Sequence, residues 1–80
     1  MKLVLVEWDD AYSNGGWHKK DADDYTVAAC VTVGLLVCQD GKQVTVAHNM
    51  SITSGNIGDT ISIPRGSVKR IRKLEVRNEL

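Results

Sequence analysis

The sequence predicts an all-β fold: a small five-stranded, strongly bent barrel with a long first loop and a short 3-10 turn before the last strand. The clearest sign is the end of the chain, where residues 60–64 alternate apolar and polar side chains, residues 65–67 interrupt the pattern and residues 68–74 resume it. Pro64 removes a backbone donor and Ser67 is suited to cap a tight turn, so we expect a pivot there before a closing strand. The length of 80 residues indicates a single domain over residues 1–80.

The first half of the chain predicts two strands joined by a long loop. Residues 2–8 are mostly β-branched and aliphatic, as in a strand, and residues 9–24 are rich in Asp, Gly, Lys and Asn, as in a loop with room for one short helical turn. Residues 26–37 then predict a second strand that is apolar or small on both faces. Because a solvated antiparallel strand alternates cleanly, we expect the core to cover one face and another protomer or the long loop to cover the other. Gly34 predicts a bend in this strand.

The second half predicts a hairpin, a polar loop and two closing strands. Asp40 and Gly41 form the pair favoured in hairpin turns, and residues 43–48 return as a third strand with Val44 and Val46 toward the core. Residues 49–59 are dominated by Asn, Ser, Thr and Gly, which predicts a loop whose backbone amides are open to a ligand.

The closing segment leaves two interpretations open. The apolar side chains of this segment recur every third residue, at Val68, Ile71 and Leu74. This spacing is typical of a short amphipathic helix, although a strand can also contain it. We expect a strand and keep the helix as the alternative.

The charges cancel in number but are divided along the chain. Ten basic and ten acidic residues remove the simplest electrostatic argument for a nucleic-acid partner. The acidic residues of the first half are Glu7, Asp9, Asp10, Asp21, Asp23 and Asp24, and the basic residues of the end are Arg65, Lys69, Arg70, Arg72, Lys73 and Arg77. This division suits head-to-tail self-association, pairing within one chain, or an anionic ligand. Because so short a chain buries a small share of its surface, we expect a homo-oligomer.

The amino terminus and the cysteines predict a cytoplasmic protein. The apolar run of residues 3–6 stops at Glu7 and no small-residue cleavage site follows, which is unlike a signal peptide or a membrane span. Cys30 and Cys38 lie eight residues apart on one expected strand, too far for a disulfide, so we predict reduced thiols that are buried as small hydrophobic side chains.

No motif for catalysis, metal or cofactor binding is present in the sequence. His18 and His48 are not arranged with a nucleophile and a carboxylate, and the aspartates of residues 21–24 lack the glycine and the distal glutamate of a calcium loop. The glycine pairs do not match a phosphate-binding loop. We therefore predict a protein that is not an enzyme and that holds no metal or cofactor.

Binding is a better hypothesis, and five residues are its candidates. Trp17 follows two glycines and lies beside His18, so it could stack on a base or on a neighbouring subunit. Trp8 ends a strand and is expected to plug one end of the barrel. Arg65 stands with Ser67 and Lys69 in a combination that suits a phosphate oxygen, with a solvated turn as the alternative.

Several short motifs carry a resemblance to known proteins over most of the chain. They are Val6-Glu7-Trp8, Gly16-Trp17, Val31 to Val37, Ile63 to Val68 and Ile71 to Leu74. Their order resembles a group of short phage-encoded proteins of unassigned role, and the pattern is similar to that of Sm-like and SH3-like small barrels. The polar stretch of residues 49–59 departs from the resemblance.

The resemblance implies one use, because some small phage proteins sequester cyclic nucleotide signals and so silence the immune response of the host. Our first hypothesis is accordingly a homo-oligomer in the bacterial cytoplasm that holds a nucleotide at its subunit interfaces. The alternatives are an Sm-like or SH3-like nucleic-acid adaptor, which the neutral net charge disfavours, and a structural protein–protein interaction subunit.

Overall fold

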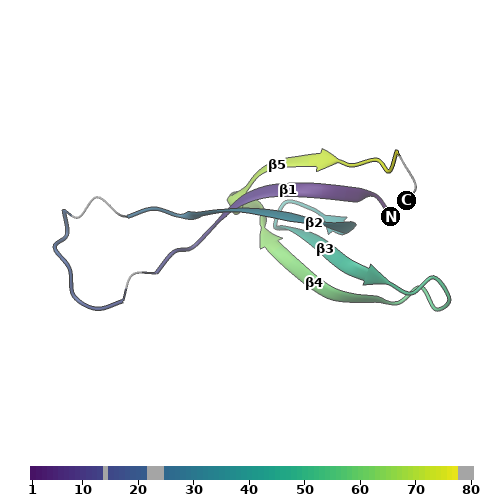
Figure 1. Cartoon of the computed structure of the whole chain (residues 1–80), viewed down its shortest axis with the longest axis horizontal. Helices are drawn as coiled ribbons and strands as arrows, with labels where there is room; N and C mark the ends of the chain where they lie inside the picture. Colours follow the sequence, from purple (N-terminus) through teal and green to yellow (C-terminus); the bar gives the residue numbers. More distant parts are fainter. Residues whose placement is uncertain (14, 22–24, 78–80) are drawn as a thin grey trace.

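The computed structural model describes residues 1–13, 15–21 and 25–77, and it confirms the all-β class. Five antiparallel strands form one bent sheet in the order β4-β3-β2-β1-β5 (Figure 1). They are β1 (Leu3–Asp10), β2 (Ala28–Gln39), β3 (Gln43–Met50), β4 (Ile57–Pro64) and β5 (Val68–Lys73), with the expected 3-10 turn η1 (Arg65–Ser67) directly before β5. β4 and β5 stand at the two ends of this order and are not paired with each other, so the predicted barrel is not closed by hydrogen bonds.

β2 serves both halves of the sheet, as predicted, and changes its partner beside Gly34. Residues 28–35 of this strand pair with β1, whereas residues 35–39 pair with β3. Gly34 is buried at the change of partner, and a Cβ atom there would lie 2.5 Å from Val46 Cγ1 and 2.6 Å from the Ala47 carbonyl oxygen. The close approach of β3 therefore requires a residue without a side chain.

The hydrophobic core lies between the two halves of the bent sheet and is small. Its buried members come from three strands: Val4, Val6, Val44, Val46 and Ile63. The predicted inward orientation of Val44 and Val46 is confirmed, since both are fully buried. Half-buried apolar side chains pack around this cluster: Trp8, Leu36, Ile61, Val68 and Ile71.

The closing segment is a strand, and a bulge explains its helix-like spacing. β5 pairs with β1, with Ile71 opposite Val6 and Val68 opposite Trp8, and the register shifts between these two pairs. A bulge adds one residue to one strand, so two residues three apart can point to the same face. Val68 and Ile71 both reach the core in this way.

Two local predictions were wrong. The stretch of residues 49–59 is not an open loop, because Asn49 and Gly58 are paired across β3 and β4 and only residues 51–56 form the turn. The Ser51 amide donates to the Asn56 carbonyl, and the Asn49 side chain donates to an Asp59 carboxylate oxygen at 2.7 Å, so polar groups expected to be open are already bonded. Ser67 does not cap the 3-10 turn, since it is the last residue of η1 and the turn begins after Pro64 without a side-chain cap.

The predicted Asp-Gly hairpin turn joins β2 to β3, and hydrogen bonds to the Asp40 side chain stabilise it. One carboxylate oxygen of Asp40 accepts the amides of Lys42 at 2.7 Å and Gln43 at 3.0 Å. These two hydrogen bonds favour the charged form of Asp40 and hold its pKa below the ordinary value. The bond from the Lys42 amide has the larger effect. The stability that they contribute is present above the ordinary pKa of an aspartate and is lost as pH falls through the lowered pKa.

Asp40→Asn is therefore expected to reduce the acid sensitivity of the fold. The amide oxygen of asparagine can still accept the two backbone amides but does not titrate in this range. Thermal unfolding measured at neutral pH and at pH about 2 should show a smaller drop in midpoint for the variant than for the parent protein. Equal drops would contradict this account, as would a nuclear magnetic resonance titration that places the Asp40 carboxyl at its ordinary pKa.

The long loop between β1 and β2 projects from the sheet as an arm. We call residues 11–27 the arm; it leaves the sheet along the line of β1 and β2 and contains no helical turn in its described residues (Figure 1). The molecule measures 54 × 26 × 24 Å, and its radius of gyration of 16.5 Å exceeds the value of about 12 Å expected for a compact domain of this length. The arm is thus outside the packed part of the chain. In the described residues, no helix has the length and apolar character needed to cross a membrane.

Candidate functional site

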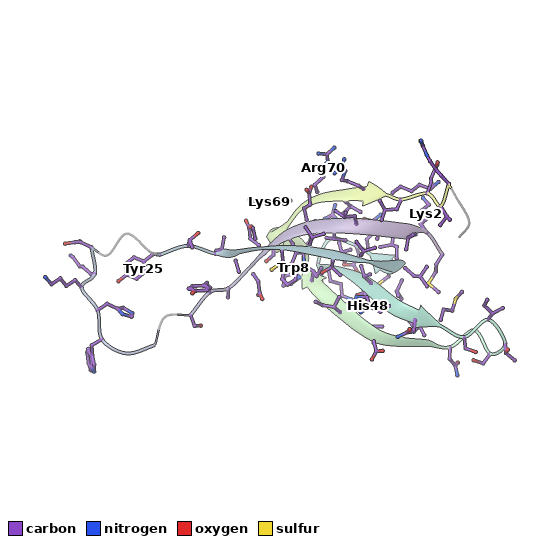
Figure 2. The ribbon with its side chains drawn as sticks, in the orientation of Figure 1. Lys2, Trp8, Tyr25, His48, Lys69 and Arg70 are labelled. Carbon is purple, nitrogen blue, oxygen red and sulfur yellow. The ribbon has the colours of Figure 1, made fainter. Side chains whose placement is uncertain are left out.

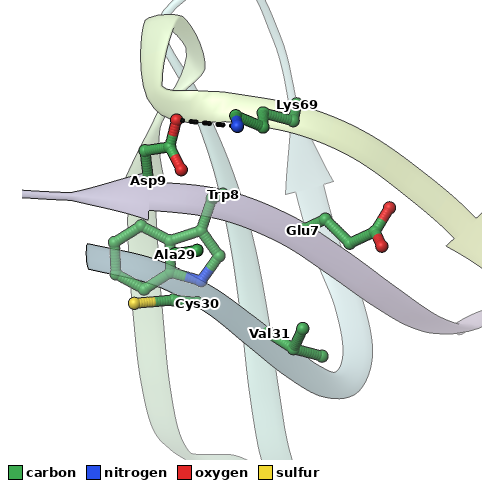
Figure 3. Close-up of a pocket in the computed structure, with 7 residues that line it drawn as sticks. All are labelled: Glu7, Trp8, Asp9, Ala29, Cys30, Val31 and Lys69. Atoms are coloured by element: carbon green, nitrogen blue, oxygen red, sulfur yellow. Dashed lines mark ion pairs between the residues drawn. The ribbon is translucent and has the colours of Figure 1, made fainter. Parts of the chain in front are cut away.

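A pocket of about 300 Å³ lies where β1 and β2 leave the sheet to become the arm (Figure 3). Three residues of β1, three of β2 and one of β5 line it: Glu7, Trp8, Asp9, Ala29, Cys30, Val31 and Lys69. The β1 and β2 residues are direct partners in the ladder, so the two paired strands form the floor. The volume is at the low end for ligand pockets and suits a single flat ring system.

Strand alternation gives the pocket two kinds of side chain. Glu7 is paired with Val31 and Trp8 with Cys30, and neighbouring pairs in a ladder point to opposite faces of a sheet. Trp8 packs against the core, and its indole nitrogen donates a hydrogen bond to the Thr32 hydroxyl at 3.0 Å. The expected contact of Trp8 with the core is confirmed, although the sheet around it is not closed into a barrel. Glu7 and Val31 belong to the opposite, outer face.

The outer face of β2 is apolar and uncovered in the single chain. Val31 and Val33 are 62% and 45% exposed, although they sit in the middle of β2. The arm does not cover them, because it runs away from the sheet (Figure 2). Of the two covers expected for this face, the long loop is excluded and another protomer stays a prediction.

Lys69 brings a positive charge to the edge of the pocket. Its ammonium group lies 3.2 Å from an Asp9 carboxylate oxygen, as the dashed line in Figure 3 shows, and its side chain is still 65% exposed. Within the described part of the chain this is the only ion pair. Arg70 and Arg72 on the same strand therefore face solvent without an ion-pair partner among the described residues.

The five residues predicted to bind a ligand fall into two groups. Trp17 and His18 lie on the arm, Arg65 and Ser67 lie in η1, and Lys69 lies near the start of β5. Trp17 is fully exposed. The structure brings the second group onto consecutive elements and leaves the first group on the arm, so a single chain does not assemble the predicted site.

The arm has some internal order around His18. The ring of His18 meets the ring of Tyr25 edge-on, with centroids 6.3 Å apart, and the Tyr25 hydroxyl donates to the Lys19 carbonyl at 2.9 Å. These contacts connect the outgoing and returning halves of the arm and leave Trp17 at its surface. Asp23 and Asp24, which belong to the acidic stretch of the sequence, lie outside the described residues.

The turn η1 offers less to a phosphate than its sequence suggested. The Arg65 amide already donates to the Lys42 carbonyl at 2.8 Å, so it is not open to a ligand. The Arg65 guanidinium makes one long hydrogen bond, 3.5 Å, to the Gln39 side-chain oxygen. This exposed guanidinium and the Ser67 hydroxyl are what the turn can present.

Sequence reasoning did not identify most of the pocket. Glu7, Asp9 and Ala29 line it only because β1 pairs with β2 in this register, and a register between distant segments is not written in local patterns. Val31 carried a usable signal, since it belongs to the strand that is apolar on both faces.

Neither cysteine forms a disulfide, in agreement with the prediction. Cys30 is half-buried beside Trp8, but Cys38 is exposed, which corrects the expectation that both are buried. Cys38 follows a bulge at the far end of β2, where the core has ended. Among the described residues no group of three or more potential ligands could hold a metal ion.

Comparisons with models of protein families, with curated proteins and with solved structures find no match to this chain.

Proposed function

We propose that this protein is a non-enzymatic binding protein that acts as a homo-oligomer and holds a small nucleotide-type ligand where its copies meet. The observation that carries the proposal is the arm, which presents a fully exposed Trp17 on a segment that packs against no part of the described sheet. An exposed tryptophan on a projecting segment is typical of a residue that anchors a protein interface or that stacks on a base.

The separation of the predicted ligand residues supports assembly as part of the function. Trp17 and His18 can approach Arg65, Ser67 and Lys69 most simply if they come from different copies. The uncovered apolar face around Val31 and Val33 provides surface for such contacts. The unpaired edges of β4 and β5 provide more.

The chemistry of the two groups fits a nucleotide. An indole ring stacks on a base without regard to sequence, while a guanidinium, a hydroxyl and an ammonium group suit phosphate oxygens. The use implied by the resemblance to short phage-encoded proteins is sequestration of a nucleotide signal of the host, and it is part of this proposal.

Binding of a cyclic dinucleotide, with cyclic AMP as a smaller probe, tests the proposal. We expect saturation at a fixed ratio of ligand to oligomer in calorimetry, and at least tenfold weaker binding by Arg65→Ala, because a charge-assisted bond to phosphate is lost. Arg77→Ala is the matched control, since it removes an exposed arginine outside the proposed site. Native mass spectrometry of the same samples reports the number of subunits.

Three outcomes would contradict the proposal. If neither probe binds, the ligand is not a nucleotide of this kind. If Arg65→Ala and Arg77→Ala weaken binding equally, Arg65 is not part of the binding site. If the protein is a monomer at all concentrations, it does not act as an oligomer. Steep loss of affinity for single-stranded RNA with rising salt would instead support the adaptor alternative, which the unpartnered Arg70 and Arg72 of β5 favour.

A further inference from the structure

We infer that Trp17 on the arm of one copy occupies the pocket at the base of the arm of a second copy. The inference rests on the homo-oligomeric part of the proposed function and names the surfaces that form the contact. It does not require the ligand.

The arm carries an uncovered indole, and the pocket of the same copy is poorly placed to receive it. The arm starts at the pocket and runs outward from it, so that Tyr25 lies well away from Trp8 and Lys69 (Figure 2). Trp17 is thereby left fully exposed. Burial of an indole removes about 150–250 Å² from water, which makes this side chain the largest apolar contribution that the arm can offer.

The pocket has the chemistry to receive an indole. Ala29 and Val31 supply apolar floor, and the volume of about 300 Å³ suits one flat ring system. Lys69 places an ammonium group at the edge, where it can lie over the face of the ring. The carboxylate of Glu7 has no ion-pair partner among the described residues and can accept the indole N–H.

The charges beside the two surfaces are complementary. On the arm, Lys19 and Lys20 lie nearest to Trp17 and are opposite in charge to Glu7 and Asp9 of the pocket, and Asp21 follows them. β5 borders the pocket through Lys69 and carries Arg70 and Arg72, whose guanidinium groups lack an ion-pair partner in the described residues. An arm docked in the pocket of a second copy would bring these opposite charges near each other.

A two-fold arrangement doubles every contact. If each arm fills the other copy's pocket, two indoles are buried, and the exposed rings of Tyr12 and Tyr25 lie on the same two arms. Two indoles at about 150–250 Å² each, together with four tyrosine rings that are 59% or 51% exposed, could remove on the order of 1,000 Å² from water, the lower bound for a specific interface.

Docking would also bring together the residues that were predicted to bind a ligand, with Trp17 as the interface anchor. It would place Trp17 and His18 of one copy beside Lys69 of the other, and Ser67 and Arg65 lie two and four residues before Lys69 in the chain. The two groups that a single chain keeps apart would then meet at one interface.

Cross-linking between two differently substituted chains tests the inference. One chain carries His18→Cys, which leaves Trp17 in place, and a larger tagged chain carries Val33→Cys, at an exposed position of β2 beside the pocket; both carry Cys30→Ser and Cys38→Ser. The mixture is treated with a short bis-maleimide linker, and only contacts between copies give the mixed cross-linked species. The control replaces His18→Cys by Ile52→Cys, which lies 92% exposed in the turn between β3 and β4.

We expect at least tenfold more mixed product from His18→Cys than from Ile52→Cys, and we expect Trp17→Ala added to the His18→Cys chain to abolish the difference. Circular dichroism establishes that each variant is folded. Equal yields, or a yield that Trp17→Ala does not change, would overturn the inference. If native mass spectrometry still shows an oligomer in that case, the docking is wrong and the proposed function stands; a monomer would overturn both.

Discussion

Gly34→Ala is expected to prevent the protein from folding. The added methyl group would lie 2.5 Å from Val46 Cγ1 and 2.6 Å from the Ala47 carbonyl oxygen. Both atoms belong to β3, the strand with which β2 pairs. Val46 is fully buried in the core, and the Ala47 oxygen is part of the backbone, so neither can move aside cheaply. Overpacking alone costs about 1–3 kcal/mol, and separating β2 from β3 would add to it. A domain of this length has a total stability of about 4–12 kcal/mol.

Far-ultraviolet circular dichroism and urea unfolding measure this effect. Gly41→Ala is the matched control, because a Cβ atom at Gly41 meets no other atom within 4 Å and its φ is not positive. We expect the control to unfold within about 1 kcal/mol of the parent protein. Similar losses for both variants would mean that the bend of β2 does not depend on the close approach at Gly34.

Ile63→Ala is expected to cost about 2–5 kcal/mol of unfolding free energy, the range for removing most of a buried aliphatic side chain. Ile63 is 1% exposed and is the largest fully buried side chain of the protein's described residues. It is also the sole member of the buried cluster that comes from β4. Because β4 is otherwise paired on one edge only, loss of this anchor should release the strand as well as leave a cavity.

The same substitution at an exposed site provides the comparison. Ile52 is 92% exposed, so Ile52→Ala should change the free energy of unfolding by less than about 0.5 kcal/mol. Urea unfolding of the two variants under one condition gives both values. If the two substitutions cost the same, Ile63 is not the anchor that its burial indicates.

Local patterns in the sequence were enough to predict the strands and their order along the chain. Asp40 and Gly41 fix a turn by their own chemistry, and Val44 and Val46 alternate with the period of a strand. Gly34 could be recognised as a special backbone position because a glycine in the middle of an apolar strand marks a bulge, a bend or the close approach of another backbone. These predictions depend on a few neighbouring residues, which is why they held.

Features that depend on distant pairing were predicted less well. Asn49 and Asp59 suggest a loop by composition, yet they face each other across two strands and bond to one another. Each strand from β1 to β4 also ends or begins a few residues away from its predicted limit. The pocket as a whole could not be predicted, because Glu7, Val31 and Lys69 come from three strands that only the folded sheet brings together.

The pairing of β1 with β5 has a consequence for how the protein is made. β1 to β4 pair in the order of the sequence and can form hairpins as they are synthesised, but the second edge of β1 must wait for β5, which lies about sixty residues later, at Val68–Lys73. Contacts between such distant segments form slowly, because a long loop must close before they give any stabilisation. Until β5 leaves the ribosome, the edge of β1 and the core side chains Val4 and Val6 lack their final cover. We therefore expect the pairing of β5 with β1 to be the last step in forming the sheet.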